Sequence, residues 1–581
     1  MSSLPYFLIE PAVAAGGYAF EHARVQPVIF KNDDGSIAIV LGHPILGERI
    51  AREEVAAQLR DRMNDDVWLA SLNGEFLLFL ISDNRLRIAN SRFSYPPLWY
   101  SARPGDFVAS TLFATIFDKM ISRGRNSINQ QAAFEMLVYK RVYGTKTLHD
   151  DIRLLEPAHR LDVENGTLKS KAYWSPDFST KIDISTEDAA DELSGRLTAS
   201  IRRKSSDARR YALFLSGGMD TRLILAHASK ANLHLPCITI NAFENREVRV
   251  AKQAAAIAGQ EHHFLPTLPG HYAVTLDEAV ELSGGMSMPM CMFHGHAEAV
   301  RPIADVAFHG HGFDYFFQGM YIPAKRYAIA GRVIPYRRMR AINGDIVDDF
   351  IKSISYRLKG ASLEQTGVPE AFNARINILR DELRDIAGGL SNRASGPIDI
   401  YEWLTFHNLA RHYSTGDHWG INLLAEQRTI SFDNDLYSLY SQLPHHVRFD
   451  ARAMRLSLRR QSPDLANLIS ANHGYPIGMS SAGRTVLMTA DFLRRRLLPW
   501  KRPEAADAFD RMGLPQEYLM VTEWRDALLD LSRSPRLEMF DFLDIAKTRP
   551  FLQSVADGRK VGDVQFLTLV MSLDRFLARR V

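Results

Sequence analysis

The spacing of hydrophobic residues divides the chain into two parts. Up to about residue 175, short apolar runs alternate with turn signals such as Asp33-Asp34-Gly35, which is typical of an α+β domain. Amphipathic helices are predicted at 49–63 and 128–142. A linker is predicted at 175–188. Strands are predicted at 26–30, 36–40, 75–81, 85–89, 98–100 and, with turns between them, within 145–175.

The second part begins with a predicted helix at 185–204, followed by the continuous apolar run Tyr211–Leu215. A run without polar positions is typical of a buried parallel strand. Strands and helices then alternate, which predicts a doubly wound parallel sheet. The further predictions are a helix at 221–230, a strand at 235–241, a helix at 246–258, and mostly helical segments at 345–435 and 480–581.

Composition and charge narrow the class of protein. The 581 residues are 46% hydrophobic and 24% charged, as in an ordinary globular protein, which excludes collagen, coiled coil and wholesale disorder. Because 70 basic residues nearly balance 67 acidic ones, we expect no nucleic-acid partner. The two cysteines, Cys237 and Cys291, exclude a disulfide framework. Without a signal peptide or a long apolar span, a cytoplasmic protein with no membrane contact is expected.

The segment Leu215-Ser216-Gly217-Gly218-Met219-Asp220-Thr221 lies between the predicted buried strand and a helix. Its glycines let backbone amides approach a phosphate closely, and the start of the helix adds partial positive charge. Ser216 and Thr221 supply hydroxyl groups, and Asp220 is suited to hold a Mg²⁺ ion. The pattern indicates a site for metal and pyrophosphate. A plain Gly-Gly turn with an Asp cap is the structural alternative.

A second loop with glycines follows the apolar run that starts at Val306, and it contains Gly310, Gly312 and Asp314. Because the carboxyl ends of parallel strands meet at one edge of a sheet, we expect Asp220 and Asp314 to share metal ions. His309 and His311 are tempting metal ligands. No third ligand lies at a sensible spacing, however, which favours a structural role for both histidines.

These loops resemble those of the asparagine synthetase family of N-type ATP pyrophosphatases, and the resemblance runs nearly end to end. Ser216–Thr221 is similar to the family's Ser-Gly-Gly-x-Asp-Ser/Thr loop, and Gly310–Gly319 to its Gly-x-Gly-x-Asp-Glu-x-Phe-Gly-Gly loop. Further similar positions are Ile88–Tyr100, Asp151–Pro157, Tyr173-Trp174, Glu247, His262-His263, and the series Asp417, Glu426, Arg428, Phe432 and Asp433.

The resemblance implies an α/β protein with two domains. Residues 1–175 would form an Ntn-hydrolase-like α+β sandwich of the class II glutamine amidotransferase type. Residues 185–581 would form an adenine-nucleotide α-hydrolase-like (PP-loop) doubly wound parallel sheet with a helical C-terminal part. The implied activity is that of a ligase that uses ATP and Mg²⁺ to convert a carboxylate into an acyl-adenylate and then into an amide. The implied nucleotide-binding residues are Leu215, Ser216, Gly217, Gly218, Asp220, Thr221, Gly310 and Gly312.

Departures from the family pattern bear on activity. The family's glutaminase uses an N-terminal cysteine, whereas position 2 here is Ser, and Asn90-Ser91 replace an Arg-Asp pair, so we predict an inactive glutaminase-like domain. Tyr315 replaces a Glu, and Asn472 and His473 stand where a lysine is expected. Candidate bases are Glu426 and Tyr315. The structural alternative for Glu426 is an ion pair with Arg428, and that for Tyr315 is packing among aromatic residues. The predicted catalytic residues are Asp220, Asp314, Glu426 and His473, the first two also as metal ligands.

The substrates stay open. We expect a small-molecule or peptide carboxylate, attacked by ammonia or a substrate amine, and a partner protein of a biosynthetic pathway is an option. Cysteine-less relatives include β-lactam synthetases and lasso-peptide macrolactam cyclases. A macrolactam cyclase, an ammonia-dependent asparagine synthetase and a non-catalytic ATP-binding protein are the alternatives. The basic stretches Arg337–Arg340 and Arg494–Arg502 are predicted to be solvated faces, with contact to a precursor peptide or anionic polymer as the alternative.

Overall fold

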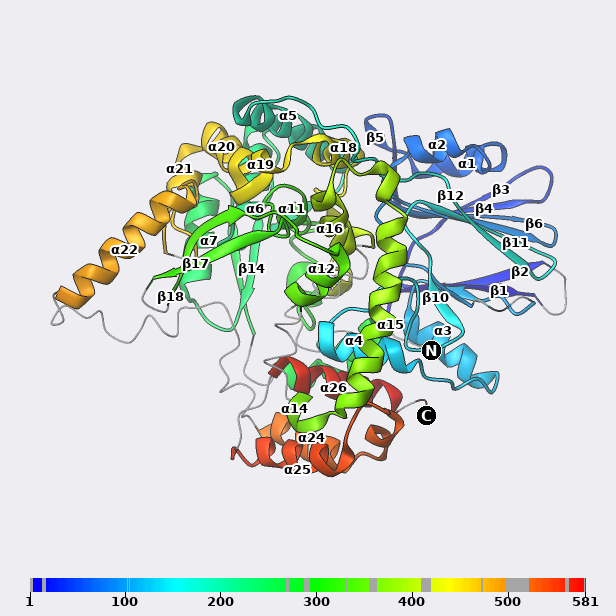
Figure 1. Ribbon diagram of the computed structural model, residues 1–581. Coiled ribbons are helices and arrows are strands. Elements are labelled where there is room, and N and C mark those ends of the chain that lie inside the picture. Colours follow the sequence, from blue (N-terminus) through cyan, green and yellow to red (C-terminus); the bar gives the residue numbers. More distant parts are fainter. Residues whose placement is uncertain are drawn as a thin grey trace.

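The computed structural model describes residues 4–12, 17–101, 103, 105–267, 271–286, 293–329, 332–354, 363–408, 419–471, 474–497, 522–559, 564–578 and 580. Figure 1 shows stacked sheets from the N-terminal part on one side of the molecule and a parallel sheet with its helices on the other. Helices from the C-terminal end of the chain gather below both.

The N-terminal sheets lie face to face because successive side chains of a strand point to opposite faces. In β1 (Tyr6–Pro11), Phe7 and Ile9 enter the core between the sheets, whereas Leu8 packs in the core beneath the helices α3 (Phe113–Ser122) and α4 (Gln130–Tyr139). In β6 (Asn73–Ser82), Phe79 enters the middle core, whereas Leu78 packs in the core shared with α1 (Arg52–Arg62) and α2 (Asp66–Ser71). The layers are therefore helix, sheet, sheet, helix, which confirms the expected α+β sandwich.

The remaining strands of this part are β2 (Tyr18–Ala23), β3 (Val28–Lys31), β4 (Ile37–Leu46), β5 (Arg49–Ile50), β7 (Arg85–Asn90), β8 (Trp99–Ser101), β9 (Ala109–Ser110), β10 (Ile152–Leu154), β11 (His159–Glu164) and β12 (Thr167–Ala172). One sheet has the order β10-β8-β9-β1-β2. The other has the order β12-β11-β7-β6-β4-β3, with β5 beside β4.

The second sheet system is parallel, as predicted. Its strands are β13 (Tyr211–Phe214), β14 (Cys237–Asn241), β15 (His262–Pro266), β16 (Val306–His309) and β19 (Glu426–Thr429), in the order β15-β14-β13-β16-β19. From β13 the chain adds strands outward on one side through β14 and β15, and on the other through β16 and β19. The junction of β13 and β16 is therefore a topological switch point, where parallel α/β sheets bind ligands at the carboxyl edge.

Helices cover the parallel sheet on both faces. The helices α5 (Thr186–Lys204), α6 (Met219–Lys230), α7 (Arg246–Ile257) and α20 (Arg452–Gln461) share a large apolar core with it. Side-chain caps fix where two of them begin, because Ser185 accepts a hydrogen bond from the backbone N–H of Asp188 and Asn245 accepts one from that of Val248. The other helices here are α8 (His271–Val274), α9 (Leu276–Ser283), α10 (Ala297–Val300), α11 (Phe313–Phe316), α18 (Asn434–Gln442), α19 (His445–Arg448) and α21 (Pro463–Asn467).

The C-terminal helices join the two parts of the chain. Leu379, Phe551 and Phe576 share one apolar core with Phe113 and Phe134 of α3 and α4. Among the described residues, no helix is both long and apolar enough to span a membrane. The helices of this region are α12 (Ile346–Ile354), α14 (Leu363–Thr366), α15 (Pro369–Gly388), α16 (Pro397–Phe406), α24 (Thr522–Arg533), α25 (Ile545–Ala556) and α26 (Val564–Leu577).

Two elements extend to one side of the parallel sheet. They are the hairpin of β17 (Ala324–Ile329) and β18 (Arg332–Met339), and the helix α22 (Ser481–Leu497). Figure 1 shows α22 reaching away from the body with the hairpin beside its inner end. The pattern of hydrophobic residues predicted neither this hairpin nor the strands β1 and β2.

Candidate active site

The loop after β13 is held together by its own hydroxyl groups. The backbone N–H of Ser216 donates to Thr221 Oγ1 at 3.2 Å, and the N–H of Gly218 donates to Ser216 Oγ at 3.1 Å. Thr221 Oγ1 donates to the backbone carbonyl of Ser216 at 3.2 Å. The loop is therefore shaped before any ligand arrives, and α6 begins directly after Gly218.

Gly217 is required by close packing. A Cβ atom at this position would lie 2.4 Å from Cβ of Ala471, so a larger residue would push the two segments apart. Arg222, which is fully buried, donates to the carbonyl of Gly217 at 2.9 Å and to those of Leu468 and Ile469 at 2.8 and 2.6 Å. The loop is thus tied to the segment just before residues 472–473, and sequence reasoning did not single out Arg222.

The second loop touches the first. A Cβ atom on Gly310 would lie 2.8 Å from Cβ of Asp220, so only glycine lets the loops approach this closely. Gly312 has a φ of +92°, and a Cβ there would lie 2.2 Å from Oγ of Ser431. Asp314 follows in the first turn of α11, and Gln318 Nε2 donates to Asp220 Oδ1 at 2.5 Å. The structure therefore brings Asp220 and Asp314 together at the carboxyl edge of β13 and β16.

The pKa values of both carboxyl groups are raised, mainly because the groups are buried. Burial and the nearby charge of Asp314 raise the pKa of Asp220 well above its ordinary value. Burial also raises the pKa of Asp314 to about 7, against hydrogen bonds from nearby backbone that lower it. Two carboxylates in one buried place with no bound cation are a source of uncompensated negative charge.

This pair fits a magnesium ion that is also held by phosphate oxygens. Carboxylate oxygens suit Mg²⁺, which usually takes one or two carboxylates together with substrate phosphates. No cluster of three or more His, Cys, Asp or Glu side chains in the described residues could hold a metal without such help. Asp220 and Asp314 are thus suited to a metal that arrives with a nucleotide.

The raised pKa values predict that stability depends on pH in the absence of magnesium. The pKa of Asp314 is higher in the folded chain than the ordinary value near 4, so the folded state holds its proton more tightly. The contribution of protonated Asp314 to the free energy of unfolding is complete below about pH 4 and is lost as the pH rises through about 7. At pH 8 without magnesium, we expect Asp314→Asn to raise the melting temperature by about 2 °C or more, measured by calorimetry.

The matched measurement adds MgCl₂ and ATP at pH 8. The wild type should then melt at a higher temperature, whereas the Asp314→Asn variant should respond much less. A variant that melts below the wild type at pH 8 without magnesium would show that the two carboxylates do not repel each other.

The other side chains of the second loop are packed. Tyr315 is fully buried, with its ring 5.2 Å from that of His311 and 5.4 Å from that of Phe406. His309 Nε2 lies 3.4 Å from Thr429 Oγ1, and its Nδ1 accepts from the backbone N–H of His311 at 3.3 Å. These contacts agree with the packing role expected for both histidines and with the structural alternative for Tyr315.

Glu426, in contrast, is not near the aspartates. It is the first residue of β19 and pairs in register with Val306, so it lies at the amino edge of the sheet, one strand length from the glycine loops. Its Oε1 accepts from Arg428 Nε at 2.8 Å, and it also pairs with Arg209. Burial alone would raise its pKa, but the charge of Arg428 lowers it, which makes this carboxylate a poor base. The ion pair with Arg428 is the structural alternative given above.

Some predicted residues cannot be compared. His473, Asn472 and Asp417 lie outside the described residues. Glu247, in contrast, is nearly buried at the start of α7. It accepts from Asn241 Nδ2 at 3.1 Å and from the backbone of Gly217, so it belongs to the support of the first loop.

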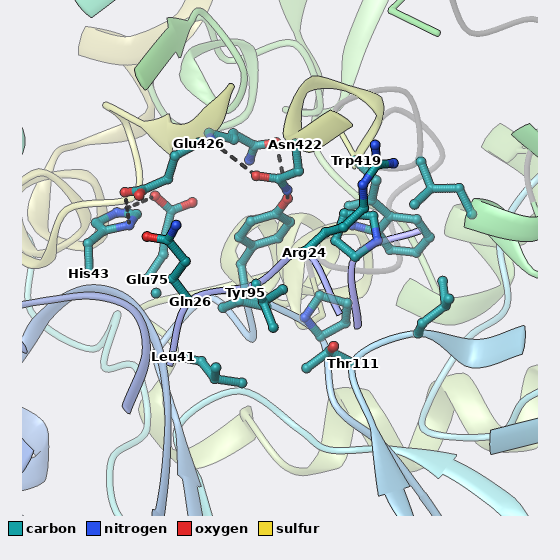
Figure 2. A pocket seen from close by; sticks show the side chains of 18 of the residues that line it. Arg24, Gln26, Leu41, His43, Glu75, Tyr95, Thr111, Trp419, Asn422 and Glu426 are labelled. Carbon is teal, nitrogen blue, oxygen red and sulfur yellow. Dashed lines mark hydrogen bonds and ion pairs between the residues drawn. The ribbon is translucent and has the colours of Figure 1, made fainter. Parts of the chain in front are cut away.

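A separate cavity of about 330 Å³ lies between the two domains (Figure 2). Glu75 Oε2 lies 3.1 Å from Nε2 of His43 and 3.3 Å from Nζ of Lys204, and it accepts from the backbone N–H of Thr429 at 2.9 Å. Burial alone would raise the pKa of Glu75, but the charge of Lys204 and the contacts with His43 and the backbone of Thr429 lower it to about 2. Tyr95 reaches across to donate to Gln427 Oε1 at 3.1 Å. Glu426 lines this cavity and not the edge that carries the aspartates.

Comparisons with known proteins agree with this arrangement. The asparagine synthase family model matches residues 192–461, and the glutamine amidotransferase domain model matches residues 53–174. No curated protein matches the chain. Among solved structures, it is similar to glutamine phosphoribosylpyrophosphate amidotransferase from B. subtilis, at 10% identity over 45% of this chain and 74% of that chain, with a TM-score of 0.20. It is also similar to NMN synthetase from Francisella tularensis, at 14% identity over 30% and 70%, with a TM-score of 0.18.

Similarities with TM-scores this low are not used to assign the domains. The assignment of the domains depends on the family models and on the site residues. The two models follow each other without overlap and together match about two thirds of the 581 residues. The asparagine synthase match contains both glycine loops and both aspartates. The N-terminal match falls within the sandwich of two sheets. Residues 192–461 are therefore an asparagine synthase domain, and residues 53–174 are a glutamine amidotransferase domain.

Proposed function

We propose that the protein is an ATP-dependent ligase that joins a carboxylate to a nitrogen nucleophile and releases AMP and pyrophosphate. The observation that carries this proposal is the contact between the two glycine loops. Gly310 allows the second loop to lie against Asp220, and this contact places the buried carboxyl groups of Asp220 and Asp314 near each other, where burial raises the pKa of both. A triphosphate with magnesium would supply a cation for this pair.

In this reading, the first loop binds the leaving pyrophosphate. The start of α6 and the hydroxyl group of Ser216 lie at the edge of the sheet where phosphates bind in parallel α/β folds. Gln318 orients Asp220 through its hydrogen bond, and Arg222 fixes the carbonyl of Gly217. When bound between Asp220 and Asp314, Mg²⁺ would neutralise charge that develops on the phosphates.

The bonds change in two steps. A carboxylate oxygen of the substrate attacks the α-phosphorus of ATP, the bond from the α-phosphorus to the bridging oxygen breaks, and pyrophosphate leaves with that electron pair. A nitrogen nucleophile then attacks the carbonyl carbon of the acyl-adenylate. AMP leaves, the nitrogen loses a proton, and an amide remains.

The nitrogen does not come from a glutaminase cysteine in the N-terminal part. The two cysteines of the sequence are Cys237 and Cys291, both in the second part. Cys237 is buried in β14, where burial raises the pKa of its thiol to about 12. Since a neutral buried thiol is a poor nucleophile, we propose free ammonia or an amine of the substrate as the nucleophile.

The bond that is cleaved in ATP tests this proposal directly. The protein is incubated with MgCl₂, ATP, ammonium chloride and one carboxylate at a time, beginning with ¹⁸O-labelled aspartate. We expect AMP and pyrophosphate in equal amounts, with one ¹⁸O atom in the AMP. Formation of ADP and phosphate would contradict the proposal.

Two further outcomes separate the alternatives. Product with aspartate and ammonium would identify an ammonia-dependent asparagine synthetase, and product only with a peptide that carries its own amine would identify a macrolactam cyclase. ATP that binds, measured by calorimetry, but yields no AMP with any carboxylate would indicate a non-catalytic ATP-binding protein.

A further inference from the structure

The hairpin of β17 and β18 stands beside the second glycine loop. Arg337 Nη2 donates to the backbone carbonyl of Gly319 at 3.2 Å, and its guanidinium lies 5.0 Å from the ring centre of Phe449. Gly319 directly follows Gln318, which contacts Asp220. A molecule bound along the hairpin would therefore lie close to the loop that contacts Asp220.

The hairpin places positive charges directly opposite each other. In its antiparallel register, Lys325 pairs with Arg338 and Arg326 pairs with Arg337. Like charges in directly opposed cross-strand positions are destabilising. We call these four residues the hairpin patch. Lys325, Arg326 and Arg338 are exposed, and Arg337 is half-buried.

Acidic side chains do not compensate this charge. In the part of the chain that the structure describes, no member of the hairpin patch forms an ion pair, whereas nearby Arg340 pairs with Asp349 and Arg484 with Asp450. Burial lowers the pKa of Arg337, and the charges of Arg326 and Arg484 add to this effect, although Asp450 opposes it. The fold therefore keeps a repulsive arrangement that glutamate at any one of these positions would relieve.

The same surface offers features that suit an extended polypeptide. No further strand pairs with β17 or β18 in the described residues, so the hairpin leaves backbone donors and acceptors for an added strand. Exposed apolar side chains accompany the charges, namely Tyr336 and Val333 on the hairpin, 41% and 63% exposed, and Val486 on α22, 67% exposed. α22 packs against β18.

We propose that the hairpin patch binds an acidic peptide segment, which adds along the hairpin and places its carboxylates beside the cationic pair on one face, Lys325 and Arg338, or the pair on the other, Arg326 and Arg337. Charge complementarity selects acidic residues, and the open strand and the apolar side chains favour a polypeptide over a polysaccharide. This inference does not depend on the proposed ligase activity, because binding can be measured without ATP.

The test measures binding of a fluorescein-labelled 12-residue peptide of alternating Glu and Val to the full-length protein by fluorescence anisotropy. The charge-matched opposite peptide, of alternating Lys and Val, should not bind. The double variant Lys325→Gln/Arg338→Gln should weaken binding of the acidic peptide about tenfold and reduce its dependence on salt.

A matched control removes two exposed arginines elsewhere. The variant Arg49→Gln/Arg60→Gln changes the net charge equally on the N-terminal part and should leave binding unchanged. Thermal unfolding gives a second readout. Removal of a structurally required pair would lower the melting temperature, whereas loss of a repulsive cross-strand pair should leave it unchanged or raise it.

Three results would overturn the inference. One is the absence of saturable binding of the acidic peptide to the wild type. Another is equal affinity of the wild type and Lys325→Gln/Arg338→Gln. The third is heparin binding that is tighter than peptide binding and lost in the same variant, which would assign the patch to an anionic polysaccharide.

Discussion

Replacement of Asp220 by asparagine is expected to lower the rate of pyrophosphate release by about a thousandfold. The change removes one negative charge and keeps the shape of the side chain, so the hydrogen bond from Gln318 is the main contact at risk. Asp314→Asn should have an effect of the same order, because in the proposed function the two carboxylates act on one ion. The measurement is pyrophosphate release at saturating ATP, with magnesium concentration varied.

The control lies at the other end of β16. Asp305 directly precedes that strand and pairs with Arg210 at 2.7 Å, so Asp305→Asn removes the same charge at the amino edge of the sheet. It should retain activity within about twofold, as an exposed ion pair contributes little. The double variant Asp220→Asn/Asp314→Asn should be little worse than either single variant. Full activity of either single variant would mean that the aspartates hold no ion during the reaction.

Gly312→Ala is expected to destabilise the fold by about 3 kcal/mol and to inactivate the enzyme. The φ of +92° disfavours any residue with a side chain, and the new Cβ would lie 2.2 Å from Oγ of Ser431. That hydroxyl donates to the carbonyl of His311 at 2.5 Å, so it cannot turn away freely. Because Asp314 follows two residues later, a shift of this loop displaces one of the two carboxylates proposed to hold magnesium. Urea unfolding measures the stability.

Gly344→Ala separates steric clash from backbone strain. Gly344 has a φ of +84°, but a Cβ there meets nothing within 4 Å. Its substitution should cost only about 1 kcal/mol, the penalty of the conformation alone. Adding Ser431→Ala to Gly312→Ala should recover part of the lost stability, since it removes the nearest clashing atom. Equal losses for Gly312→Ala and Gly344→Ala would show that the second loop has room to adjust.

The pattern of hydrophobic residues predicted an element correctly where the residues of that element alone carry the signal. The run Tyr211–Leu215 is apolar at every position because both faces of β13 are covered, and the prediction of a buried parallel strand is confirmed. The pattern failed for β2, where polar residues such as Glu21 and His22 occupy exposed positions, and for the hairpin β17–β18, whose strands carry many charges. These strands are held by pairing with a neighbour, which a single segment does not encode.

The predicted site residues also fall into those that the sequence placed correctly and one that it did not. Spacing of glycines and aspartates in the sequence placed Asp220 and Asp314 after two strands of one parallel sheet, and the geometry of such sheets brings their carboxyl ends together. Glu426 matched its family position equally well, yet it lies at the amino edge among arginines. The difference is that the aspartates follow their strands, whereas Glu426 begins one.

By itself, the sequence determined the division into a sheet-rich first part and a parallel α/β second part, the buried strand β13 and the two loops that carry glycine and aspartate, because these features depend on local periodicity and on residues close together in the chain. Only the tertiary structure decided which residues support those loops. Arg222, Gln318 and Ser431 act across separations of many residues, and the register of β17 and β18 pairs Lys325 with Arg338 and Arg326 with Arg337. Such contacts arise when distant segments pack, and no local pattern specifies them.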